Sequence, residues 1–268
     1  MLTRILSAVI LILAALSTVL YAKPAVYLVG IGIIGTGCLY EYCRIMHAID
    51  IRTRPWFLCC VFWCLIIALY LKSVPSVAAL SLSIILIVIS AVFRKKLSVK
   101  ERSFGMMAET MGIFYIVLCL YPAVAVRFAF GNDTGLQWTL LLLLVTWGGD
   151  SFALIAGRKI GKRPLAPVLS PKKTKEGSLV GLMAGVGIAV CLKTVLFKDL
   201  PLHHVVITAF LLGISGQIGD LAESMIKRTA GVKDSSKLIP GHGGVLDRMD
   251  SLLLSIPVLY GYLLFLYH

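Results

Sequence analysis

Residues 136–157 read LQWTLLLLLVTWGGDSFALIAG, and Asp150 is the only charged residue in this run. About 20 consecutive apolar residues are enough for a helix to cross the hydrocarbon core of a bilayer. Working outward from this run, similar apolar stretches recur toward both ends of the chain. The sequence therefore predicts a polytopic membrane protein whose helices carry a few buried polar groups.

Hydrophobicity places nine predicted transmembrane helices. They cover residues 5–22, 25–42, 56–72, 76–93, 104–126, 136–157, 177–197, 203–226 and 250–267. Backbone exposed to lipid must satisfy its own hydrogen bonds, so an all-α fold is expected, and the length of the runs excludes a barrel. The first run resembles a signal peptide in outline. We expect it to be a retained helix because the next segment is also apolar and Leu20 fits a cleavage motif poorly.

The composition excludes an ordinary soluble domain. Of the 268 residues, 59% are hydrophobic and 15% are charged, and the mean hydropathy is +0.92. The seven cysteines fall in or beside apolar runs, without the spacing of disulfide frameworks or zinc sites. We expect them to be small buried hydrophobic residues.

The basic residues predict the orientation of the chain. The loops 43–55, 94–103, 158–176 and 227–249 together contain 20 of the 26 Lys and Arg residues. Loops rich in Lys and Arg stay in the cytoplasm. With Arg4 before the first span, this bias predicts that the N-terminus and all four loops are cytoplasmic.

Polar residues become frequent after about residue 130, which divides the chain into two expected regions. Residues 1–130 are predicted to be a scaffold of transmembrane helices, in which Glu41 and Glu109 are exceptional acids. Residues 131–268 are predicted to be the catalytic region, with cytoplasmic loops 158–176 and 227–249.

In the second region, Asp150 falls inside the predicted span 136–157, and Asp220 and Glu223 fall inside the predicted span 203–226. A carboxylate at membrane depth is costly unless it is paired, hydrated or bound to a cation. Asp220, Glu223, Ser224 and Lys227 follow i, i+3, i+4, i+7 spacing and so share one helix face. These groups predict a shared polar cavity near the cytoplasmic surface.

The loop after this face combines acids with phosphate-binding residue types. Asp247 and Asp250 form a second i, i+3 pair, although acids at a helix start are also ordinary capping residues. Between the two pairs, glycines permit a tight backbone beside a ligand, and Lys and Arg suit phosphate oxygens. Carboxylates that hold Mg²⁺ beside clustered Lys residues are what a metal-bound polyphosphate requires.

Two motifs carry a resemblance to a known family. The first reads Ser224-x-Ile226-Lys227-Arg228-x₄-Lys233-Asp234-x-Ser236-x₂-Ile239-Pro240-x-His242-Gly243-Gly244-Val245-x-Asp247-Arg248-Met249-Asp250. The second reads Ser170-Pro-Lys172-Lys173-Thr-x-Glu-Gly177. Both resemble signatures of the phosphatidate cytidylyltransferase family, also called CDP-diacylglycerol synthase, and the first shows no departure over its 27 positions. The surroundings of Asp150 match more loosely, since Phe152 and Leu154 stand where tyrosine or other aromatic residues are common. The first 130 residues are similar only in hydropathy.

The resemblance implies the reaction of CTP with phosphatidic acid to give CDP-diacylglycerol and pyrophosphate. It implies Mg²⁺ as the cofactor, leaving a second cation open, with Asp220 and Asp247 as ligands and Asp150 and Asp250 as further candidates. The implied catalytic residues are Asp220, Asp247, Lys172, Lys173 and Arg248. The implied substrate-binding residues are Ser170, Lys175, Ser224, Lys227, Arg228, Lys233, His242, Gly243 and Gly244. The expected location is the inner (plasma) membrane, with the active site on the cytoplasmic side and no nucleic-acid partner.

The expected mechanism is a direct in-line attack by the lipid phosphate. That phosphate is already anionic near neutral pH, so a strong general base is unnecessary, and no Ser/His/Asp or Cys/His nucleophile set emerges. His242 has two readings, as a general base or as a residue that holds the turn or donates to phosphate. We favour the second.

Other functions remain as alternatives. A CTP-dependent lipid-alcohol kinase would release CDP in place of pyrophosphate. The D-G-x₂-A-R-type motif of alcohol phosphotransferases that consume CDP-diacylglycerol is absent. A transporter would show broken helices in paired repeats, and the sequence shows no internal duplication.

Small residues predict close helix packing in one span. Gly177, Gly181 and Gly185 recur every four residues and line one helix face. Such contacts leave a homodimer open as well as a monomer, because all of them can form within one chain.

Overall fold

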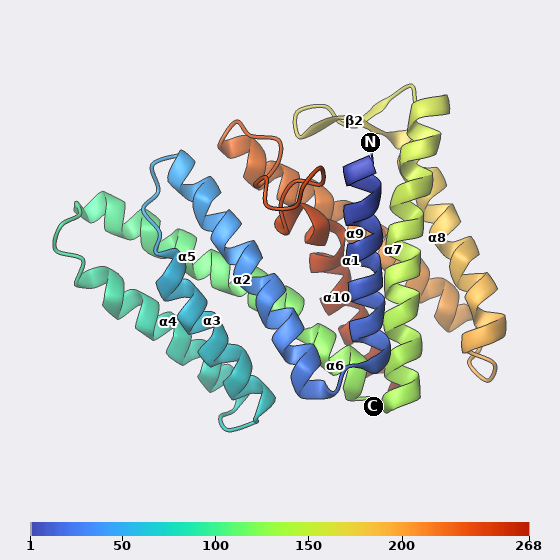
Figure 1. The fold of residues 1–268 in the computed structure, drawn as a ribbon, viewed down its shortest axis with the longest axis horizontal. Coiled ribbons are helices and arrows are strands. Elements are labelled where there is room, and N and C mark those ends of the chain that lie inside the picture. The colour runs from blue at the N-terminus through green and yellow to red at the C-terminus, as the bar shows by residue number, and fades with distance from the viewer. Residues whose placement is uncertain (1, 268) are drawn as a thin grey trace.

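The computed structural model describes residues 2–267, and the side chains of residue 6 and residues 9–267. Ten helices and two short strands make up the described part of the chain (Figure 1). The helices are α1 Leu2–Tyr21, α2 Pro24–Ala48, α3 Pro55–Tyr70, α4 Ser76–Val92, α5 Val99–Leu120, α6 Pro122–Phe128, α7 Asn132–Ile160, α8 Lys175–Leu196, α9 Leu202–Thr229 and α10 Leu246–Tyr267. The strands are β1 Pro164–Ala166 and β2 Ser170–Thr174.

The chain is a multi-pass membrane protein. Among residues 2–267, six helical segments are long and apolar enough to cross a bilayer, by length and composition: Pro24–His47, Val99–Phe128, Asn132–Ile160, Lys175–Leu196, Leu202–Thr229 and Leu246–Tyr267. Three shorter apolar helices accompany them, at Val9–Tyr21, Pro55–Tyr70 and Ser76–Val92. Each of the nine apolar runs identified in the sequence is therefore helical.

One predicted helix is interrupted at a proline. The run 104–126 is divided into α5 and α6 at Pro122, the first residue of α6. Proline has no backbone N–H and clashes with the preceding turn of a helix, which is why α5 ends before it.

The expectation of an all-α fold is wrong in one place. Within the loop 158–176, β1 and β2 pair antiparallel, with Pro164 opposite Thr174 and Ala166 opposite Ser170. Thr174 then caps α8, since its hydroxyl accepts a hydrogen bond of 3.1 Å from the Gly177 N–H. The Ser170–Thr174 motif is thus a strand that leads directly into a helix.

The last helix begins earlier than predicted. It starts at Leu246 in place of residue 250, so Asp247 lies in its first turn. Likewise α9 continues to Thr229, which places Lys227 in its last turn. The polar loop between them is therefore shorter than the predicted 227–249 loop.

Glycines bring α7 and α8 close together. Gly177, Gly181 and Gly185 are all buried, which confirms the predicted packing face. A Cβ added at Gly181 would lie 2.7 Å from both the Gly149 carbonyl oxygen and the Ala153 Cβ of α7. The backbones of the two helices meet where these side chains are absent.

The polar segments gather at one edge of the molecule. In Figure 1 the start of α1, the β1–β2 hairpin and the link from α9 to α10 all lie at the upper edge. The links α1–α2, α6–α7 and α8–α9 lie at the lower edge. Loops far apart in the sequence are thus placed on the same side of the helical bundle.

Candidate functional site

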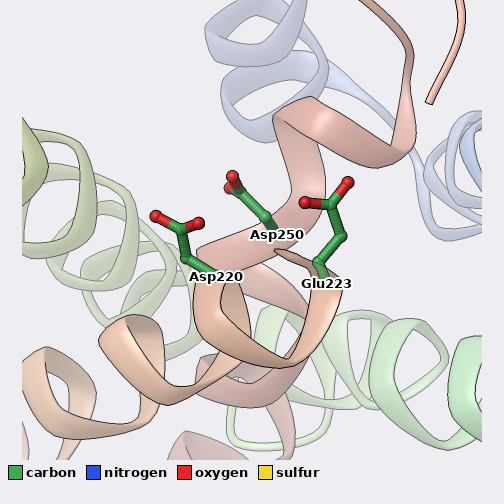
Figure 2. Close-up of side chains that lie close together, drawn as sticks. All are labelled: Asp220, Glu223 and Asp250. Carbon is green, nitrogen blue, oxygen red and sulfur yellow. The ribbon is translucent and has the colours of Figure 1, made fainter. Parts of the chain in front are cut away.

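Three carboxylates converge where α9 packs against α10. Asp220 and Glu223 come from α9 and Asp250 from α10, and one ligand oxygen from each lies within 4.8 Å of the others (Figure 2). The helices approach closely because α9 has a glycine at the crossing: a Cβ on Gly219 would lie 2.5 Å from the Asp250 carbonyl oxygen. We call Asp220, Glu223 and Asp250 the acid cluster.

Two lysines form ion pairs with members of the acid cluster. Lys173 of β2 forms an ion pair with Asp220, and Lys227 forms one with Glu223. Lys227 also donates a hydrogen bond of 2.6 Å to Asp247 Oδ1. Each lysine comes from a different motif, so both motifs contribute to one site.

The Asp247 carboxylate is enclosed by donors. Besides Lys227, its Oδ2 accepts hydrogen bonds from the Ser235 N–H at 2.9 Å, the Ser235 hydroxyl at 2.8 Å and the Gly244 N–H at 2.8 Å. Gly243 has a φ of +82°, a backbone conformation that favours glycine, and this turn directs the Gly244 N–H inward. Asp247 therefore fastens the loop to the start of α10.

Asp150 lies beside the acid cluster, attached to α10. Its Oδ2 accepts a hydrogen bond of 3.0 Å from the hydroxyl of Ser251, the residue after Asp250. This contact brings α7 to the site, as expected from an acid inside an apolar helix.

The acid cluster fits a hard divalent cation such as Mg²⁺, which prefers carboxylate oxygens. Glu223 is fully buried, and its Oε1 has no hydrogen-bond partner among the described residues. An orphaned buried acceptor calls for a cation or a donor that the described residues do not supply.

The predicted ligands are divided by the fold. Asp220 and Asp250 lie in the acid cluster, whereas Asp247 and Asp150 have the protein donors described above. Metal binding by any of the four stays a prediction. Glu223 was absent from the predicted ligand set, although its i, i+3 spacing from Asp220 was the signal that could have included it.

The remaining basic residues have different positions. Arg228 joins the two polar segments, because its Nε donates to the Leu169 carbonyl at 3.2 Å and its Nη1 to the Val232 carbonyl at 3.0 Å. Four others have exposed side chains: Lys172, Lys175, Lys233 and Arg248. Exposed cations of this kind are suited to phosphate oxygens.

The other predicted substrate-binding residues are more enclosed. Ser224 is buried on α9 next to Glu223, and Ser170 begins β2 and is half-buried. The His242 N–H donates to the Ile239 carbonyl at 2.9 Å, so its backbone forms part of the turn. This leaves both readings of the His242 side chain as predictions.

An open cleft of about 550 Å³ lies between the end of α2 and the loop after α9. Its lining residues are Arg44, Ile45, Ala48, Val232, Lys233, Asp234, Ser235, Ser236 and Lys237. Ser235 belongs both to this cleft and to the donors around Asp247. The cleft therefore borders the residues that hold Asp247.

Comparisons with known proteins identify the family of this chain. The model of the cytidylyltransferase family matches residues 2–266. A phosphatidate cytidylyltransferase of Bacillus subtilis (strain 168) is 37% identical over 151 residues, which are 56% of this chain and 55% of that protein. One from Staphylococcus haemolyticus is 33% identical over 190 residues, 71% of this chain and 70% of that protein.

A chloroplast protein is also similar. Phosphatidate cytidylyltransferase 4, chloroplastic, of Arabidopsis thaliana is 37% identical over 185 residues, 60% of this chain and 46% of that protein. The aligned part of the chain thus spans about half the length of the Bacillus and Arabidopsis relatives. Because the family model accounts for nearly every residue from the first helix to the last, this chain belongs to the cytidylyltransferase family.

Proposed function

We propose that this protein transfers CMP from CTP to phosphatidic acid, giving CDP-diacylglycerol and pyrophosphate. The observation that carries the proposal is the acid cluster, with Lys173 and Lys227 beside it. Similar proteins are named phosphatidate cytidylyltransferase. Acids paired with lysine ammonium groups suit a reaction in which two anions must be brought together.

Asp220, Glu223 and Asp250 would hold Mg²⁺, with Asp150 and Asp247 as neighbouring acids that fix the surrounding helices and loop. When bound, the ion would supply positive charge to the polyphosphate and to the departing pyrophosphate. The supporting observation is the convergence of carboxylate oxygens from two helices at one point. A second cation is left open.

The basic residues would hold the phosphates in line for direct attack. Lys173 and Lys227 form ion pairs with the acids, and Lys172, Lys233 and Arg248 are exposed cations in the same two motifs. The lipid phosphate carries its own negative charge, so these residues orient the attacking oxygen and need not remove a proton from it.

The topology we propose has nine membrane-crossing segments, a cytoplasmic N-terminus and a cytoplasmic active site in the inner membrane. It has a scaffold at 1–130 and a catalytic region at 131–268. The basic loops and the clustering of both polar segments at one edge support this arrangement. Monomer and homodimer are the two alternatives for the assembly, which a mass measurement in detergent distinguishes.

The test incubates the purified full chain with labelled CTP, phosphatidic acid and Mg²⁺. A lipid-soluble cytidine product with release of pyrophosphate is expected. Release of CDP with a polyprenol acceptor would identify a lipid kinase, and CTP that stays intact in both reactions would refute the proposal. A covalent cytidylyl-protein intermediate in a single turnover would contradict direct attack.

A further inference from the structure

Glu41 of α2 binds the loop after α9 through four hydrogen bonds. Its Oε1 accepts from the Ser236 hydroxyl at 2.6 Å and the Val245 N–H at 3.0 Å. Its Oε2 accepts from the Ser235 hydroxyl at 2.7 Å and the Leu246 N–H at 2.8 Å. The side chain is fully buried. One carboxylate of α2 thus holds both ends of the segment 235–246, which lies about 200 residues later in the chain.

Two of these donors belong to the start of α10. The first N–H groups of a helix have no partner within the helix, and a negative charge there is favourable. Glu41 satisfies the Leu246 N–H in this way, from a different helix. It therefore acts as a cap for the helix that carries Asp247 and Asp250.

Gly244 makes this contact possible. A Cβ at position 244 would overlap both Ser235 Oγ and Glu41 Oε2. Any larger residue would force the carboxylate and the loop apart. The glycine in the motif is therefore explained by a residue outside the motif.

The contact continues to the acid cluster. Ser235 touches both Glu41 and Asp247, Asp247 accepts from Lys227, and Lys227 is paired with Glu223. The chain of contacts from Glu41 to the acid cluster has no gap. A shift of the loop at Ser235 would displace Asp247. Lys227 would then move with it, and its ion pair with Glu223 would be disturbed.

Glu109 provides a comparison. It is also fully buried, but it forms a 2.5 Å ion pair with Arg54 and lies 3.7 Å from Arg94. Glu41 forms no ion pair with any described residue, and its four hydrogen-bond donors are all neutral. A buried carboxylate without a cation is costly, and here the ordered loop and the helix start supply the compensation.

We propose that Glu41 is a positioning residue for the active site: it holds the loop 235–246 in the form that places Asp247 and Lys227 against the acid cluster. The inference deepens the proposed cytidylyl transfer and rests on it for the kinetic effect. The ordering of the loop itself does not depend on which reaction occurs.

The first test is structural and needs no substrate. The Lys237–Leu238 bond lies in this loop with both side chains exposed, so trypsin can report whether the loop is held. In Glu41→Gln an amide NH₂ replaces one acceptor among four donors, and faster cleavage at Lys237 is expected. Glu109→Gln is the matched control, with another fully buried carboxylate changed, and its cleavage at Lys237 should equal that of the wild type.

The second test is kinetic. Glu41→Gln should lower kcat by about 100-fold with KM for CTP nearly unchanged, because misplacement of reacting groups by about 1 Å has this effect. It should also raise the Mg²⁺ concentration needed for half-maximal rate, whereas Glu109→Gln should leave that concentration unchanged. Equal losses of kcat and equal Mg²⁺ dependence in the two variants would overturn the inference.

Two further variants guard against misfolding. Glu41→Asp keeps the carboxylate and should restore part of both the trypsin resistance and kcat, and Gly244→Ala should reproduce the effect of Glu41→Gln from the other side of the contact. A folded Glu41→Gln whose loop resists trypsin like the wild type would refute the proposal. If the loop loosens while wild-type protein makes no lipid-linked cytidine, the positioning role stands and the proposed reaction fails.

Discussion

Lys173 of β2 forms an ion pair with Asp220 of α9, and this contact joins the two sequence motifs in one site. The hairpin that carries Lys173 is fastened on its other side by Arg228, which donates to the Leu169 carbonyl. The segment that precedes α8 is therefore part of the wall of the acid cluster.

Removing the Lys173 ammonium group should impair turnover. For Lys173→Ala we expect kcat/KM for CTP to fall by about 100-fold, because a cation aimed at developing phosphate charge is lost. The matched control is Lys159→Ala, near the end of α7. Lys159 is an exposed lysine that also precedes α8, and it forms no ion pair among the described residues. Equal activities of the two variants would exclude Lys173 from the site.

Asp247→Asn should abolish turnover without unfolding the protein. The amide has one acceptor oxygen where Lys227, Ser235 and Gly244 present their donors, so the loop loses its attachment to α10. Activity is measured with labelled CTP, and folding by thermal melting in detergent. Turnover like that of the wild type would remove Asp247 both as a metal ligand and as the organiser of the loop.

Glu223→Gln separates the two candidate ligand sets. If the acid cluster holds the ion, this variant needs about tenfold more Mg²⁺ for half-maximal binding, since one of three carboxylates is lost. Binding is followed directly, by calorimetry or by Mn²⁺ resonance, so the result does not depend on catalysis. Unchanged affinity in Glu223→Gln with lost affinity in Asp247→Asn would favour the set predicted from the sequence.

Gly181→Ala should destabilise the protein by about 2 kcal/mol, because the added methyl meets the α7 backbone. The matched control is Gly187→Ala on the same helix, where a Cβ would meet nothing within 4 Å. Replacing this glycine in a helix should be neutral or stabilising by up to about 1 kcal/mol. Melting temperatures in detergent check both, and equal melting would show that α7 and α8 do not need the glycine contact.

The proposed topology predicts which residues an impermeant thiol reagent can reach. In a chain with its own cysteines replaced, a cysteine at position 198 should be labelled in intact cells, and one at 162 only after lysis. Both lysines at these positions are exposed, and they lie in loops at opposite ends of the bundle. The reverse pattern would invert the assignment of the cytoplasmic side.

Part of the site follows from the sequence because its signals are local. Asp220 and Glu223 are three residues apart on a helix, and helical periodicity puts both on one face. The apolar run continues past Pro122, but the α5 helix ends just before this residue. The spans drawn from hydrophobicity missed this break, because hydrophobicity does not show that proline lacks a backbone N–H. The start of α10 was misplaced by several residues for a similar reason: its cap is Glu41, more than 200 positions away.

The amino-acid sequence by itself determined that this is a membrane-embedded helical protein with an acidic helix face and a basic glycine-rich loop, since hydrophobic length and helical spacing are properties of short segments. Only the tertiary structure decided which acids meet. It placed Glu223 in the acid cluster, Lys173 on Asp220 and Glu41 against the loop. These contacts join residues far apart in the chain, and they depend on how closely α9 and α10 cross at Gly219 and how the loop packs on α2, which no local pattern specifies.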